Sequence, residues 1–129
     1  MSDASRIGRW IPPLALMVLI YALSDQPNLN SGLGVIDTIL RKLVHTAEFG
    51  LLCVLWRRAL RGAGVSAGQA LAIALAISIA YAVGDEYHQT FVEGRTGSAL
   101  DVAIDSMGAV LGGLWAHRRE LRSPARQRS

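Results

Sequence analysis

The stretch "AGQALAIALAISIAYAVG", from Ala67 to Gly84, is a long run of mostly apolar residues. An α-helix rises about 1.5 Å per residue, so roughly 17 to 25 mostly apolar residues cross about 30 Å of hydrocarbon. Its Leu, Ala and Ile residues form a block and are not spaced along one helical face. The stretch therefore predicts a transmembrane helix.

Three further blocks approach the same length. We expect membrane spans at about residues 7–23, 41–59, 67–88 and 98–117. The second block is apolar only from Leu43 to Trp56, so it reaches span length only if the polar turn Ile36–Lys42 continues the helix. We therefore predict an all-α protein: a four-helix transmembrane bundle in residues 1–121, followed by a basic, disordered tail in residues 122–129.

Basic residues are distributed unevenly around these spans. Of the 13 Lys and Arg residues, all but three precede the first span, separate the second from the third, or follow the fourth. Arg41, Lys42 and Arg95 fall on the opposite side, with most of the acids. The positive-inside rule then predicts a multi-pass protein of the cytoplasmic membrane with both termini in the cytoplasm. The Arg-rich tail favours anionic membrane lipids, and no nucleic-acid partner is expected.

The first span has an alternative interpretation as a signal peptide. A signal peptide has a basic region, an apolar region and a small-residue cleavage site. The sequence contains matching features in that order: Arg6 and Arg9, the apolar run after them, and the small residues Ala22–Ser24. Cleavage would leave three spans and place the amino terminus outside. We favour an uncleaved span, because a basic cytoplasmic tail fits an even number of crossings.

Two features concern packing. Gly108 and Gly112 have the GxxxG spacing that lets helix backbones approach closely, although this signal alone is weak. Cys53 is the single cysteine of the sequence, so no disulfide within the chain is available and a packing role is expected.

Polar residues occur at membrane depth in the second and fourth segments. Lys42, His45 and Glu48 recur at intervals of three and so share one helical face. Asp101 and Asp105 are one turn apart in the fourth segment. An ionised side chain at the bilayer centre costs at least about 2.5 to 3.5 kcal/mol, so these faces are expected to turn away from lipid.

The third segment ends in "DEYHQ", which begins at Asp85. Asp85, His88 and Gln89 follow an i, i+3, i+4 pattern if the helix continues past Gly84. We expect one connected polar cluster near the outer surface, with Lys42 and Arg95 neutralising acids. The predicted binding residues are Lys42, His45, Glu48, Asp85, Glu86, His88, Gln89, Arg95, Asp101 and Asp105.

Several chemistries suit such a cluster. General acid–base catalysis would use His88 or Asp85, with Arg95 holding a phosphate or carboxylate. A proton or ion path is a further possibility, and simple pairing that holds helices together is the structural alternative. Imidazole and carboxylate ligands suit a divalent ion, but HExxH and paired-cysteine spacings are absent, so neither a metal nor a cofactor is predicted.

Two motifs together resemble a known family. They are "KLVHTAEFGLL", from Lys42 to Leu52, and "DEYHQTFVEGRTGSALDVAIDSMGAVLGG", from Asp85 to Gly113. Their combination and spacing resemble the VanZ-like family of small bacterial membrane proteins. Two positions depart from the family pattern: Glu93 stands where Pro is frequent, and Asp105 where Asn is frequent. The residues that carry the resemblance are Lys42, His45, Asp85, Glu86, His88, Gln89, Gly94, Arg95, Asp101, Asp105, Gly108 and Gly112.

The resemblance implies a multi-span envelope protein. The family's namesake is associated with low-level resistance to the glycopeptide antibiotic teicoplanin, and its biochemical activity is not established. Our leading hypothesis is a polar cleft near the outer leaflet that binds an anionic or lipid-like envelope molecule. The alternatives are a membrane-embedded enzyme acting on a lipid-linked substrate, by acid–base or metal-assisted chemistry, and a structural or partner-binding subunit. The sequence makes no prediction of oligomeric state.

Overall fold

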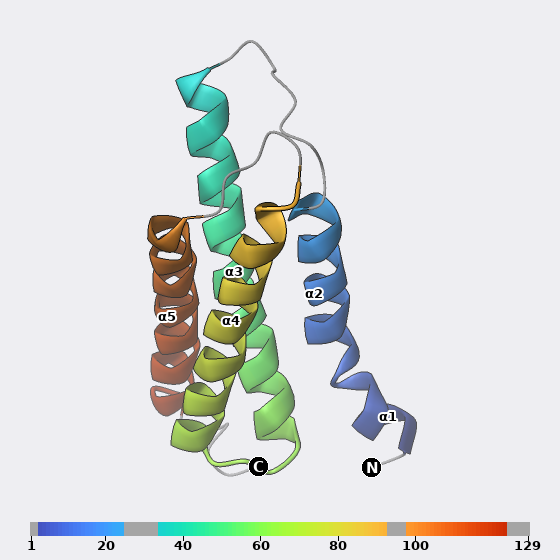
Figure 1. Ribbon diagram of the computed structural model, residues 1–129. Coiled ribbons are helices and arrows are strands. Elements are labelled where there is room, and N and C mark those ends of the chain that lie inside the picture. The colour runs from blue at the N-terminus through green and yellow to red at the C-terminus, as the bar shows by residue number, and fades with distance from the viewer. Residues whose placement is uncertain (1–2, 25–33, 93–97, 124–129) are drawn as a thin grey trace.

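The computed structural model describes residues 3–24, 34–92 and 98–123. These residues form helices and no strand, so the all-α prediction is confirmed (Figure 1). A short first helix precedes four long ones that pack into a bundle. The helices are α1 (Asp3–Gly8), α2 (Ile11–Ser24), α3 (Val35–Gly62), α4 (Ala67–Gln89) and α5 (Ala99–Leu121).

Helix starts follow local sequence chemistry. Pro12 and Pro13 lie in the first turn of α2, where a missing N–H leaves no helical hydrogen bond unmade. The hydroxyl of Ser66 caps α4 by accepting a hydrogen bond from Gln69 N at 3.4 Å. The turn between α3 and α4 contains Gly64 at φ 93°, a backbone conformation that glycine adopts without steric cost.

Helix α3 is longer than the span expected in its place. It runs without interruption from Val35 to Gly62, 28 residues, or about 42 Å at the usual helical rise. The polar turn before Leu43 therefore does continue the helix. The first turns of α3 extend beyond the neighbouring helices (Figure 1).

The outer surface of the bundle is apolar. Val18 on α2 and Met107 and Leu111 on α5 are among many large hydrophobic side chains that are more than half exposed. Within the described residues, three segments are long and apolar enough to cross a membrane: Asp3–Ser24, Ala67–Gln89 and Ala99–Leu121. Helix α3 is also long enough, but it contains more charged residues than these three segments. An apolar exterior of this extent fits contact with lipid, and the chain is a membrane protein.

The long helices alternate in direction, so the start of α1 and the end of α5 lie at one end of the bundle (Figure 1). We call this the terminal end; Gly8, Gly62 and Leu121 lie there. Helices α2 and α4 finish, and α5 begins, at the opposite end, which we call the loop end.

Glycines bring α3 and α5 into backbone contact. A Cβ atom added at Gly108 would lie 2.7 Å from Thr46 Cγ2, and one at Gly112 would lie 2.8 Å from Gly50 Cα. Both distances are too short for real carbon atoms, so the helices can cross this closely only with glycine at these positions. The contact fixes the register of α5 against the face of α3 next to His45.

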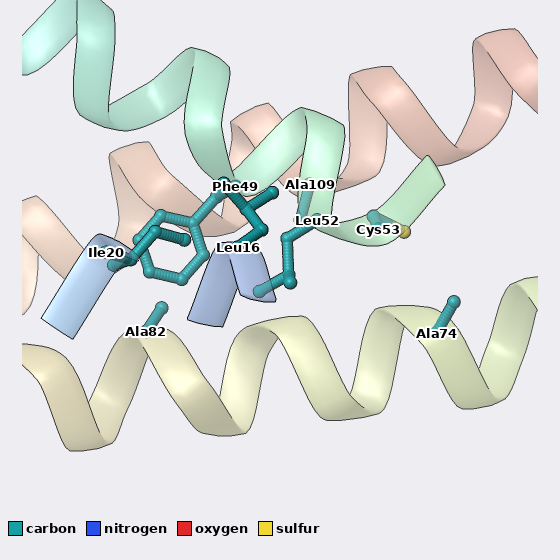
Figure 2. Close-up of a cluster of buried hydrophobic side chains, with 8 residues drawn as sticks. All are labelled: Leu16, Ile20, Phe49, Leu52, Cys53, Ala74, Ala82 and Ala109. Carbon is teal, nitrogen blue, oxygen red and sulfur yellow. The ribbon is translucent and has the colours of Figure 1, made fainter. Parts of the chain in front are cut away.

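An apolar core lies beside the polar residues of the loop end. Phe49 from α3 and Ile20 from α2 are fully buried, and Ala82 of α4 lies beside them (Figure 2). The Phe49 ring meets the His45 ring edge-on, with centroids 5.1 Å apart. Phe49 thus separates the polar residues from the apolar core of the bundle.

Candidate functional site

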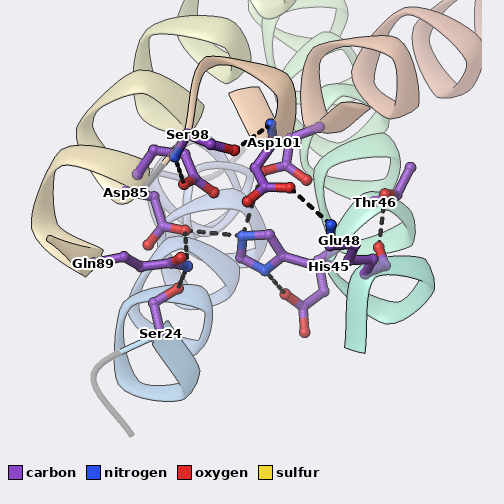
Figure 3. A network of polar contacts seen from close by, with 11 residues as sticks. Ser24, His45, Thr46, Glu48, Asp85, Gln89, Ser98 and Asp101 are labelled. Carbon is purple, nitrogen blue, oxygen red and sulfur yellow. Dashed lines mark hydrogen bonds and ion pairs between the residues drawn. The ribbon is translucent and has the colours of Figure 1, made fainter. Parts of the chain in front are cut away.

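His45 lies at the loop end with carboxylates on both of its ring nitrogens (Figure 3). Its Nε2 is 2.9 Å from Asp85 Oδ2 on α4 and 3.5 Å from Asp105 Oδ2 on α5. Its Nδ1 is 3.3 Å from Glu48 Oε2, one turn further along α3. Three helices therefore converge on a single imidazole.

These groups are largely withdrawn from solvent. The side chains of Asp85 and Asp105 are 1% and 4% exposed, and that of His45 is 19% exposed. A neutral imidazole carries one N–H, so it can donate to only one of its three carboxylate neighbours. The remaining contacts would bring lone pairs together, and burial makes such repulsion costly. The arrangement requires additional positive charge, carried by protons or by a bound cation.

Asp85 is also held by neutral partners. Gln89 Nε2 lies 3.4 Å from Asp85 Oδ2 and 3.5 Å from Ser24 Oγ, within donating distance of both oxygens. Ser24 is the last residue of α2, so this contact ties the end of α2 to the end of α4 (Figure 3). The sequence analysis did not place Ser24 in the site.

The start of α5 is fixed to the same region. Ser98 N donates to Glu86 Oε2 at 3.1 Å, and Ser98 Oγ accepts from Asp101 N at 3.1 Å. Ser98 is therefore the N-cap of α5, and Asp101 lies in the first turn of this helix. The amino-acid sequence contained a signal for this cap, because a Ser followed three residues later by an acidic residue is typical of a helix start. The exposed Lys42 Nζ lies 3.3 Å from Asp101 Oδ1 at the rim.

Eight of the ten predicted binding residues therefore gather at the loop end. We call them the acidic cluster, and they are Lys42, His45, Glu48, Asp85, Glu86, Gln89, Asp101 and Asp105. His88, the ninth, stacks its ring on Tyr21 of α2, with centroids 4.6 Å apart. Arg95 lies outside the described residues, as do Glu93 and Gly94.

The acidic cluster has more acids than bases. Among the described residues it contains five carboxylates, while Lys42 and His45 are its only side chains able to carry positive charge. His45, Glu86 and Asp105 each present one donor atom, and these three atoms lie within 4.8 Å of one another. The three side chains are therefore candidate ligands of one metal ion.

A second charged network, at the terminal end, was missed by the sequence analysis. Glu120 of α5 accepts from Arg57 Nη2 at 2.5 Å and from Arg61 Nε at 2.7 Å, both on α3. Arg57 is 4% exposed and also contacts His117 Nδ1 at 3.0 Å. The spacing of the two arginines, four residues apart on one helical face, was the available signal.

A cavity of about 410 Å³ also lies at the terminal end. Its basic lining residues are Arg9 and Arg58. The cleft expected beside the acidic cluster remains a prediction.

Comparison with known proteins places the chain in a family. The VanZ/LLP1 family model matches residues 4–119. No curated protein and no solved structure matches the chain. The matched region contains nearly all of the five helices, and with them the whole acidic cluster. The chain therefore belongs to the VanZ/LLP1 family.

Proposed function

We propose that this membrane protein lies in the bacterial cytoplasmic membrane and that its acidic cluster binds the polar head group of an amphiphilic envelope molecule. The observation that carries the proposal is His45 held between Glu48, Asp85 and Asp105. Buried charges in a membrane protein are expensive and usually mark functional sites. In a membrane, a polar contact between helices contributes about 1 to 2 kcal/mol, less than the roughly 2.5 to 3.5 kcal/mol that one buried charge costs, so stability alone does not account for this arrangement.

The proposed orientation follows from charge. The start of α1 and the end of α5 lie at the terminal end, together with eight of the ten Lys and Arg residues that the structure describes. The positive-inside rule puts that end in the cytoplasm. The acidic cluster then faces the outer leaflet, where a ligand can enter sideways from the lipid.

The proposed ligand is anionic or lipid-like and carries its polar group next to an apolar body. Lys42, half exposed at the rim, supplies a cationic group, and we expect Arg95 to supply another. A phosphate would suit an arginine, whose guanidinium binds it through two parallel hydrogen bonds. Under this proposal, a role in glycopeptide resistance like that of the family's namesake would depend on the envelope molecule bound here.

A second candidate function is acid–base catalysis on a lipid-linked substrate. The observation that favours it is the 2.9 Å contact between His45 Nε2 and Asp85 Oδ2, with Glu48 on the other ring nitrogen. A histidine oriented by carboxylates is a common general base. Asp85 stays a candidate for this role, and His45 joins the His88 of the sequence analysis.

Native mass spectrometry tests the binding proposal. Detergent-purified protein would be titrated separately with phosphatidylglycerol, phosphatidylethanolamine and a polyprenyl phosphate. We expect one of them to be retained at one molecule per chain, and His45→Gln and Asp85→Asn to lose that retention. Glu120→Gln, at the terminal end, is the control and should retain it. Equal retention by all variants that keep the wild-type circular dichroism spectrum would refute the proposal.

The same variants separate binding from catalysis. If the retained molecule is chemically altered by wild-type protein, and His45→Gln binds it without altering it, the enzyme function is favoured. If retention depends on His45 and the molecule is recovered unchanged, binding alone is favoured.

A further inference from the structure

Three side chains of the acidic cluster offer the donor set of a metal site. His45 comes from α3, Glu86 from α4 and Asp105 from α5, so the trio joins three helices. Their donor atoms lie within 4.8 Å of one another. Donor atoms about 2.0 to 2.2 Å from one tetrahedral ion lie about 3.3 to 3.6 Å apart, so the three side chains would have to move together by up to about 1.5 Å to complete the geometry.

The chemistry of the trio favours a transition metal. One imidazole with two carboxylates is a mixed nitrogen and oxygen set, which suits Zn²⁺, Mn²⁺ or Fe²⁺ better than the all-oxygen shells of Ca²⁺ and Mg²⁺. Three protein ligands also leave positions open for another molecule, as in catalytic zinc sites.

An independent observation comes from Asp105 itself. This residue is 3% exposed, and its Oδ2 atom is buried without a hydrogen bond from any described residue. The nearest cationic group to that atom is His45 Nε2, at 3.5 Å. Buried carboxylate oxygens normally accept a hydrogen bond. An oxygen that accepts none and lies beside other possible metal ligands therefore indicates a missing partner.

The second ring nitrogen of His45 supports the same interpretation. When Nε2 faces the ion, Nδ1 carries the ring proton, and this nitrogen lies 3.3 Å from Glu48 Oε2. A carboxylate on the far nitrogen is the usual outer partner of a metal-binding histidine, because it fixes the ring and raises its basicity. A cation beside Nε2 would also offset the repulsion between the lone pair of a neutral His45 and the carboxylates of Asp85 and Asp105.

We propose that His45, Glu86 and Asp105 bind a divalent transition-metal ion, with Glu48 orienting His45. The inference deepens the proposed function and rests on it for its biological role. A bound dication supplies the positive charge that the acidic cluster lacks. It also gives an otherwise acidic site a point of attachment for an anionic head group.

Electron paramagnetic resonance of Mn²⁺ tests the site directly. Protein purified with a chelator would be titrated with Mn²⁺ after the chelator is removed, and bound ion measured as lost free-ion signal. We expect one saturable site per chain. Asp105→Asn and Glu86→Gln should each weaken it more than about tenfold, since even outer partners typically contribute that much. Asp37→Asn removes an outlying carboxylate of α3 that pairs with Arg41, and should leave binding unchanged.

Two results would overturn the metal site. One is the absence of saturable Mn²⁺ binding together with Zn²⁺ below a tenth of an equivalent by elemental analysis of protein purified without chelator. The other is binding that Asp105→Asn and Glu86→Gln leave as it is in wild-type protein. In either event, lipid retention that still depends on His45 in chelated protein would leave the proposed function standing and remove only the metal.

Discussion

The two ends of the bundle contain opposite kinds of charge networks. At the terminal end, two arginines of α3 share the single carboxylate of Glu120, and Arg57 also contacts His117. At the loop end, one histidine of α3 faces three carboxylates. The first network has surplus positive charge, because two guanidinium groups share one carboxylate. The second is left with surplus negative charge, which is the property expected of a place where something positive binds.

The comparison also shows which helices matter at each end. Both networks join α3 to α5 across the same glycine-mediated contact. Only the loop end adds α4, through Asp85 and Glu86. Helix α4 supplies two of the five carboxylates of the acidic cluster, so a need to pair α3 with α5 does not explain all of them.

Glu120→Gln should produce the largest loss of stability. Removing the carboxylate leaves Arg57 buried and without its anionic partner, which costs about 3 to 5 kcal/mol for buried pairs. Unfolding of the detergent-solubilised protein, followed by circular dichroism in increasing SDS, would measure it. A midpoint within error of wild type would show that the contacts of Glu120 with Arg57 and Arg61 do not stabilise the fold.

Gly112→Val should weaken both ends together. The added side chain would meet Gly50 on α3, and overpacking of this kind typically costs about 1 to 3 kcal/mol. The same SDS titration would report the loss. Gly68→Ala is the control, because nothing lies within 4 Å of its added Cβ. Equal midpoints for the two variants would contradict the close approach of α3 and α5.

Asp105→Asn should have the smallest effect and the opposite sign. In metal-free protein it removes one of the carboxylates that repel each other around His45, so stability should stay level or rise by about 1 kcal/mol. The measurement is the SDS midpoint in the presence of a chelator. A loss as large as that of Glu120→Gln would mean that the acids of the loop end stabilise the fold as an ordinary ion pair does.

The sequence predicted the fold well because long apolar blocks leave few alternatives in a membrane. It also predicted most of the cluster, since periodic spacing identifies which residues share a helical face. It could not predict how each helix is rotated against its neighbours. His88 follows Asp85 by three residues, so its side chain lies about 60° to one side of Asp85, and this offset turns it towards Tyr21 on α2.

The sequence also could not predict which residues from distant segments form ion pairs. Arg57 and Arg61 are separated from Glu120 by the whole of α4, and their contact depends on the glycine-set register of α3 and α5. A basic residue at the end of a span has an adequate explanation in the positive-inside rule. Nothing in the local sequence required a partner for it.

The most direct test of the account compares one variant from each end in the same binding experiment. Native mass spectrometry would measure the envelope lipid retained per chain by wild-type protein, His45→Gln and Glu120→Gln under identical detergent conditions. We expect His45→Gln to lose the retained molecule although its helices stay folded, and Glu120→Gln to keep it despite lower stability. Loss of retention in Glu120→Gln with full retention in His45→Gln would contradict the assignment of function to the loop end.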